Sequence, residues 1–242
     1  MAKKRLNKKL VVILALTGIP LLVIMAIAVD SRKQILPGSI HSIVLKLFNR
    51  DPHDLEKEAD ALVEKIEKIK KDICLELNNE LTALEKVKVI NYFIYDIHKF
   101  DKSLKKAHTP QLYLLNHVID TSKGSPVMLG LIYAELARRL NLPIYGVNLP
   151  RNFVLCYYDP DYHEDPNNIL FYINPSDKGS VLGLKELKHF LRHLKIEEKE
   201  FYFTPCSGVD IIERLIINLQ FAYERSGQPE KAQALKKLLN KS

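Results

Sequence analysis

The chain has 242 residues, of which 47% are hydrophobic and 27% charged, an ordinary composition for one or two globular domains. Its formal charge is +7, but five of its 36 basic residues lie among the first nine residues, and no acidic residue precedes Asp30. The rest of the chain is therefore nearly neutral, which argues against nucleic acid as a partner.

The first predicted element is a membrane anchor over residues 10–29, behind a basic N-terminus at residues 1–9. The anchor segment carries no charge, and about 20 helical residues span the roughly 30 Å of a bilayer's hydrocarbon core. Because Lys and Arg are denser before the segment than after it, we expect a cytoplasmic N-terminus and a periplasmic or cell-surface body. Two alternatives remain open: a signal peptide cleaved near Ala28, at the small-x-small motif Ala26-Ile27-Ala28, and a cytoplasmic body.

Two amphipathic helices are predicted after a connector at residues 30–53. Apolar residues at spacings of three and four predict a helix over residues 54–77, with the stripe of Leu55, Ala59, Leu62, Ile66, Ile69 and Ile73. Similar spacing predicts a second helix from about Leu84 to Phe100, and the polar segment 101–110 is predicted to be a loop.

The central predicted element is a buried helix that begins at Pro126. Ser125 is a suitable N-cap, and Pro126 suits the first helical position because its missing N–H would have no helical partner there. Asn141 before Pro143 indicates the end of this helix, and only Glu135, Arg138 and Arg139 are charged between Val127 and Leu140. The short segments 144–147, 153–158 and 170–173 have strand composition, which predicts an antiparallel meander packed on this helix.

The tail over residues 209–241 is predicted to form two helices joined at Ser226-Gly227-Gln228-Pro229. The spacing of its small and aromatic residues is that of one tetratricopeptide-type hairpin, carried by Asn218, Leu219, Ala222, Tyr223, Gly227, Ala232 and Leu235. Because one repeat cannot bury its own hydrophobic face, we expect the hairpin to pack on the preceding domain.

Cysteine spacing predicts neither a disulfide framework nor a metal site. Cys74, Cys156 and Cys206 are few and scattered, and one bridge between an undetermined pair remains open. His163 lies among carboxylates in the loop 159–166, but the order of these side chains matches no metal-binding loop. We expect no metal and no cofactor.

The stretch from Tyr113 to Tyr158 resembles the SirB family of bacterial transglutaminase-like proteins. The matching residues are Tyr113-Leu114-Leu115-Asn116, Val118-Ile119, Gly124-Ser125-Pro126, Ala137 to Pro143 and Gly146-Val147-Asn148-Leu149-Pro150. The resemblance implies an α+β transglutaminase-like or papain-like domain over residues 54–205. A helical hairpin over residues 206–242 then follows it.

The same resemblance implies where a catalytic triad would lie. Enzymes of the wider superfamily have a Cys at the start of the buried helix, a His on the next long strand and an Asp on the strand after it. These positions read Pro126, Asn152 and Asn174 here. The family's Gly-His-Phe and Asp-Pro are replaced by Arg151-Asn152-Phe153 and Asn174-Pro175.

These replacements predict a scaffold without triad chemistry, in other words a pseudoenzyme. Proline offers neither a thiol nor a backbone N–H for an oxyanion, and an asparagine amide does not accept a proton near neutral pH. We therefore expect a membrane-anchored interaction module for a protein or peptide. A thiol-dependent hydrolase or acyltransferase using Cys156 with His163 is the alternative, because Cys156 lies four residues past Asn152 and would share its strand face. A purely structural domain is a third interpretation that the sequence does not separate from the first.

Overall fold

The computed structural model describes residues 52–102 and 109–239, which divide into two compact units. Of these described residues, the first unit contains 52–66, 109–123 and 212–239, and the second contains 67–102 and 124–211. Among the described helices, none has both the length and the hydrophobicity to cross a bilayer. The anchor expected at residues 10–29 lies outside the described residues.

The first unit is helical. It includes the 3-10 turn η2 (Pro110–Tyr113), α6 (Leu115–Thr121), most of α9 (Gly208–Arg225) and α10 (Pro229–Leu239). Gly227, with φ +76°, lies in the turn between α9 and α10, and Lys231 lies over the ring of Tyr223 at 5.4 Å. Buried side chains line both helices of this pair, namely Leu219, Ala222, Ala232 and Leu235. The two-helix tail is therefore confirmed, and its packing on the preceding domain stays a prediction.

Helix α4 (Pro52–Cys74) carries the expected apolar stripe. Leu62, Ile66, Ile69 and Ile73 are each at most 4% exposed. The predicted second helix is divided into α5 (Ala83–Asn91) and a π-helical segment, η1 (Tyr92–Ile97). A capping box between Thr82 and Glu85 fixes the start of α5. A π turn is wider than an α-helical turn, so the side chains after it point in a different direction from the one that a 3.6-residue period predicts. The sequence keeps that period and does not reveal the change.

The second unit is built around α7 (Pro126–Arg139), which begins and ends close to the predicted residues. Most of its side chains are buried, so the prediction of a central helix is confirmed. A four-stranded sheet follows in the order β3-β4-β5-β6, with every pair antiparallel. Its strands are β3 (Ile144–Val147), β4 (Val154–Tyr158), β5 (Ile169–Asn174) and β6 (Ser180–Leu182). The predicted meander is confirmed, and β6 extends it by one strand.

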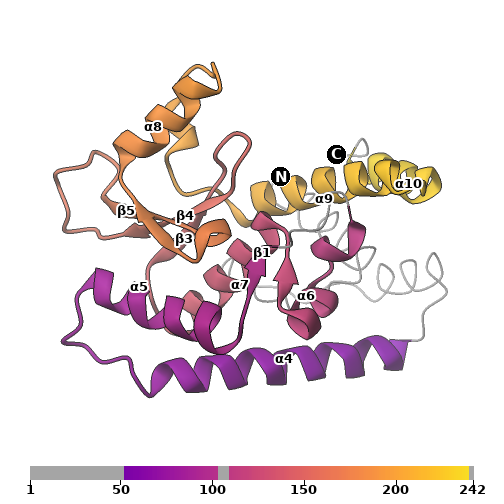
Figure 1. The fold of residues 1–242 in the computed structure, drawn as a ribbon, viewed down its shortest axis with the longest axis horizontal. Helices are drawn as coiled ribbons and strands as arrows, with labels where there is room; N and C mark the ends of the chain where they lie inside the picture. Colours follow the sequence, from indigo (N-terminus) through magenta and orange to yellow (C-terminus); the bar gives the residue numbers. More distant parts are fainter. Residues whose placement is uncertain (1–51, 103–108, 240–242) are drawn as a thin grey trace, which may run out of the picture. The chain divides into compact units, whose positions relative to one another are not determined.

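Two helices cover opposite faces of this sheet (Figure 1). Leu187 and Leu191 of α8 (Leu184–His193) pack with Cys156 and Tyr172 in one buried cluster. On the other face, Phe153 lies against Gly130 of α7. Both faces of β4 are therefore buried, which explains why this strand carries apolar residues at successive positions. The remaining elements are β1 (Asp101–Lys102), β2 (Lys123–Gly124), η3 (Pro175–Asp177) and η4 (Glu200–Tyr202).

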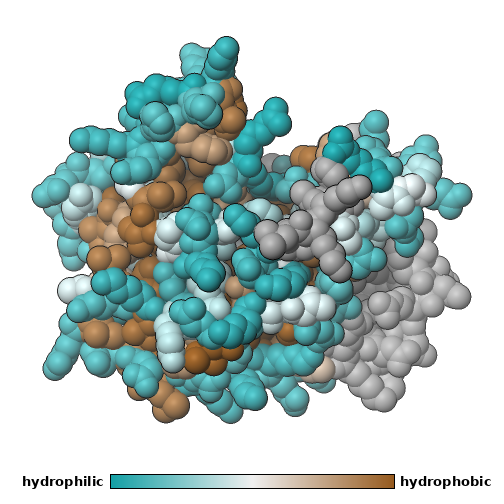
Figure 2. Space-filling model, in the orientation of Figure 1, coloured by the Kyte–Doolittle hydropathy of each residue, from teal (hydrophilic) through white to brown (hydrophobic). Residues whose placement is uncertain are grey.

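Some large hydrophobic side chains of the second unit are at its surface. Tyr92 of η1 is 52% exposed and Val181 of β6 is 41% exposed. Figure 2 shows hydrophobic side chains at the surface over the sheet and over α5, among mostly polar neighbours. This distribution makes the second unit a candidate for contact with another molecule.

Replacing Gly130 with Ala should lower the free energy of unfolding by about 1 to 3 kcal/mol. A Cβ atom at this position would lie 2.5 Å from two ring carbons of Phe153, which is 1% exposed and has no room to move away. Alanine is otherwise the better helix former by about 1 kcal/mol. A lower free energy of unfolding would therefore show that the clash with Phe153 outweighs this gain. Urea unfolding followed by circular dichroism measures the free energy of unfolding. Adding Phe153→Leu should recover part of the loss, whereas a stabilising Gly130→Ala would contradict the close contact.

Candidate functional site

The first turn of α7 is the structural centre of the candidate site. Ser125 is the N-cap, and its hydroxyl accepts a hydrogen bond from the Met128 N–H at 3.4 Å. Pro126 follows at the first helical position and is exposed, although Ser125 and Val127 on either side of it are buried. The helix therefore presents one surface-accessible position at its positive end, and that position is a proline.

The contact of α7 with the sheet brings the three expected triad segments to one region. Gly130, one turn after Pro126, lies against the Phe153 ring, and a Cβ there would also be 3.3 Å from Cγ of Pro175. Phe153 directly follows Asn152, and Pro175 directly follows Asn174. The start of β4 and the end of β5 therefore both pack close to the N-terminal turns of α7.

Both asparagine side chains stabilise their own loops. Oδ1 of Asn152 accepts from the Phe153 N–H at 2.9 Å, and Oδ1 of Asn174 accepts from the Ser176 N–H at 3.1 Å, where it caps η3. Each residue is half-buried. These local bonds give both amides a structural role that needs no imidazole or carboxylate.

A partly buried polar network that the sequence did not reveal holds the turn after Asn174. Tyr133 of α7 donates to Oδ1 of Asn91 at 3.0 Å, and Nδ2 of Asn91 donates to the Gly179 carbonyl at 2.9 Å. Tyr95 donates to the Pro175 carbonyl at 3.2 Å. Burial raises the pKa of Tyr95 and of Tyr133, so both phenols remain protonated donors at neutral pH.

This network depends on the π turn, because η1 contributes Tyr95 while the end of α5 contributes Asn91. It also requires glycine at position 179, where φ is +71° and a Cβ would lie 2.0 Å from Oδ1 of Asn91. The signal in the sequence was only a tyrosine and an asparagine among apolar helical positions, which does not identify the partners.

Cys156 lies in the hydrophobic cluster with Leu187 and Leu191 of α8, whereas Phe153 faces α7. Asn152 is not a residue of β4, so the expectation that it shares a strand face with Cys156 stays a prediction. Strand β4 starts only at Val154, so the alternation of faces does not extend back to Asn152. Burial raises the pKa of the Cys156 thiol to about 12, despite a backbone hydrogen bond from Tyr145 that lowers it.

The acidic loop around His163 is organised by its own backbone. Oδ1 of Asp159 accepts from the Asp161 N–H at 3.0 Å, and Oδ1 of Asp165 accepts from the Asn167 N–H at 2.8 Å. His163 itself is exposed. Within residues 52–102 and 109–239, His, Cys, Asp and Glu form no group of three that could hold a metal ion.

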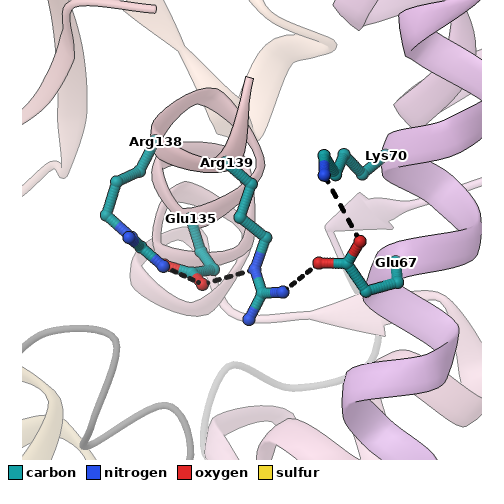
Figure 3. A network of polar contacts seen from close by, with 5 residues as sticks. All are labelled: Glu67, Lys70, Glu135, Arg138 and Arg139. Carbon is teal, nitrogen blue, oxygen red and sulfur yellow. Dashed lines mark hydrogen bonds and ion pairs between the residues drawn. The ribbon is translucent and has the colours of Figure 1, made fainter. Parts of the chain in front are cut away.

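The opposite end of α7 is fixed by charged side chains (Figure 3). Glu135, only 7% exposed, accepts from Arg138 at 2.8 Å and from Arg139 at 2.7 Å, and Arg139 also pairs with Glu67 of α4. Burial alone would raise the pKa of Glu67, but the hydrogen bond from Arg139 and the charges of Lys70 and Arg139 lower it below its usual 4.5. The ionised Glu67 side chain therefore stabilises the fold fully at pH values above its usual pKa of 4.5. This stabilisation is lost as the pH falls through the lowered pKa of Glu67.

Comparison with known proteins matches residues 60–217 to the sequence profile of the transglutaminase-like superfamily. A UPF0162 protein of Pseudomonas aeruginosa is 32% identical over 120 residues, which are 50% of this chain and 42% of that protein. A UPF0162 protein of Xylella fastidiosa is 24% identical over 153 residues, 61% of this chain and 52% of that protein.

F-box only protein 21 of Mus musculus is 25% identical over 154 residues, covering 62% of this chain and 24% of that protein. The chain thus spans about half the length, or less, of these curated relatives. No solved structure matches the chain.

Proposed function

Because the chain belongs to the transglutaminase-like superfamily, we propose that it is a non-catalytic, membrane-tethered member that presents an interaction surface to a protein or peptide. The proposal places the superfamily's Cys, His and Asp positions at Pro126, Asn152 and Asn174. It extends the SirB-type resemblance of the sequence to the whole domain.

The observation that carries the proposal is the exposed proline at the head of α7. A nucleophilic cysteine gains reactivity at a helix N-terminus because the positive end of the helix favours the thiolate. Proline at that position has no nucleophilic atom and no N–H to bind an oxyanion. The buried helix and the two loops beside it therefore keep their packing, with no reacting group at the head of the helix.

The alternative thiol enzyme receives little physical support from Cys156. This side chain is 0% exposed, and its raised pKa keeps it in the unreactive thiol form at neutral pH. Its cluster faces α8 and contains apolar side chains rather than a base. A hydrolase built on Cys156 would need the sheet to open before substrate reached the sulfur.

An interaction role is supported by apolar surface next to the η3 turn. Asn91 and Gly179 are joined by a hydrogen bond, and the exposed residues Tyr92 and Val181 lie one and two positions from them in the chain. Val181 also belongs to β6, the last strand in the sheet order. Exposed aromatic and β-branched side chains beside a sheet edge are suited to contact with an extended peptide.

Replacing Pro126 with Cys, in a chain that also carries Cys74→Ser, should create a reactive thiol. The helix N-terminus should lower the pKa of this exposed thiol by about one unit, so iodoacetamide should alkylate it about tenfold faster at pH 6 than an ordinary exposed cysteine. Cys74 in the native chain is the matched reference, because it is exposed and lies at the C-terminal end of α4. Mass spectrometry of quenched samples gives both rates.

The native chain is the second arm of this experiment. Its three thiols should all react slowly at pH 6, with Cys156 the slowest. A native cysteine that alkylates rapidly at pH 6 would contradict the non-catalytic assignment. A new thiol at position 126 that reacts no faster than Cys74 would contradict the placement of the nucleophile position.

The membrane part of the proposal rests on the uncharged segment 10–29 and the basic residues before it. Protease added outside intact spheroplasts should digest the body of the chain while the cytoplasmic N-terminus stays protected. A tag at each end, detected by immunoblotting, separates the two ends. Complete protection of the C-terminal tag, with digestion only after lysis, would refute the extracytoplasmic orientation.

A further inference from the structure

One face of α9 exposes two large apolar side chains. Ile217 is 55% exposed and Phe221 is 48% exposed. They are four residues apart, so they lie one above the other on the helix, about 40° apart around its axis. The buried face of the same helix uses other positions, including Leu215, Ile216, Leu219 and Ala222. The exposed pair is therefore additional to the contacts that hold the hairpin together.

Charged residues continue this row at both ends. Glu213 lies four residues before Ile217 and Arg225 four residues after Phe221, and both are exposed. The Arg225 guanidinium lies over the Phe221 ring, 4.8 Å from its centroid, so the arginine belongs to the same face. We call Glu213, Ile217, Phe221 and Arg225 the α9 stripe.

The α9 stripe is complementary to itself when two copies of α9 run antiparallel. A two-fold axis that crosses the exposed face midway between Ile217 and Phe221 brings Ile217 of one copy opposite Phe221 of the other, and Glu213 opposite Arg225. Each unlike pair then occurs twice, as an isologous interface requires. A parallel arrangement would instead place Glu213 against Glu213 and Arg225 against Arg225, which is repulsive.

The neighbouring charges follow the same symmetry. Arg214 and Glu224 lie within one helical turn outside the apolar pair, on the same face, and the same axis brings them opposite each other. Arg214 is half-buried and Glu224 is exposed, with its carboxylate accepting from Gln220 at 3.0 Å. Two different charge pairs therefore agree on one register, whereas a solvated face has no reason to prefer any register.

We propose that the α9 stripe is the interface of a homodimer in which two α9 helices pack antiparallel. One helix pair buries less area than the roughly 1,200 Å² of a stable interface, so the dimer is weak in free solution. Confinement to a membrane would raise the effective concentration of the chains. The inference does not depend on the absence of catalysis at α7.

Charge exchange across the α9 stripe tests this register in the full-length chain. Glu213→Arg alone and Arg225→Glu alone should each raise the dimer dissociation constant about tenfold or more, because two symmetry-related pairs become repulsive. The double exchange Glu213→Arg with Arg225→Glu should return it to within about threefold of the native value. Sedimentation equilibrium in density-matched detergent micelles measures all four constants.

Glu197→Arg is the control, since it makes the same charge change on an exposed residue outside α9, and it should leave the dissociation constant unchanged. Rescue by the double exchange also excludes misfolding as the cause of the single effects. A native chain that stays monomeric at every concentration would overturn the proposal. A double exchange that dimerises no better than either single variant would overturn the antiparallel register.

Discussion

The close approach of α7 to the sheet is the constraint on which the second unit depends. Gly130 has no side chain, and this lets the Phe153 ring and Pro175 lie directly against the helix. The contact fixes where β4 begins and where β5 ends relative to the first turns of α7. The Tyr133–Asn91–Gly179 bonds and the bond from Tyr95 to Pro175 then hold the turn after β5 in place. Steric fit and these hydrogen bonds thus define how the segments around the head of α7 are arranged.

In this arrangement, the packing around the head of α7 does not require a reacting group there. The N-terminal turn of α7 is the position at which a helix stabilises an anion most effectively, yet Pro126 supplies nothing there that could become one. The buried sulfur in the sheet, Cys156, lies in an apolar environment that favours its neutral form. A surface role is consistent with both observations, and the exposed apolar side chains of η1, β6 and α9 supply candidate surfaces.

Local signals in the sequence were sufficient for the elements whose ends are marked by caps and turns. Ser125-Pro126 and Asn141 mark α7 because N-capping and the missing proline N–H act within one turn, and Pro, Asn and Asp delimit the strands. The π turn at Tyr92–Ile97 was not predictable, since the residues around it keep a helical pattern while the backbone shifts phase. Alternation could not decide whether Asn152 shares the face of Cys156, because Asn152 precedes the first residue of β4. The partners of Asn91 and Tyr95 lie more than 40 residues away in the chain, and no local pattern encodes them.

The central claim is that Cys156, the buried cysteine of the sheet, is not prepared for nucleophilic attack, and titration of its thiol tests this most directly. In a chain carrying Cys74→Ser and Cys206→Ser, Cys156 is the single remaining thiol, and its ionisation is followed by the ultraviolet absorbance of the thiolate. The structure predicts no thiolate at neutral pH, because burial raises the pKa of Cys156 to about 12. A thiolate that forms at or below pH 7 in the folded chain would contradict the account.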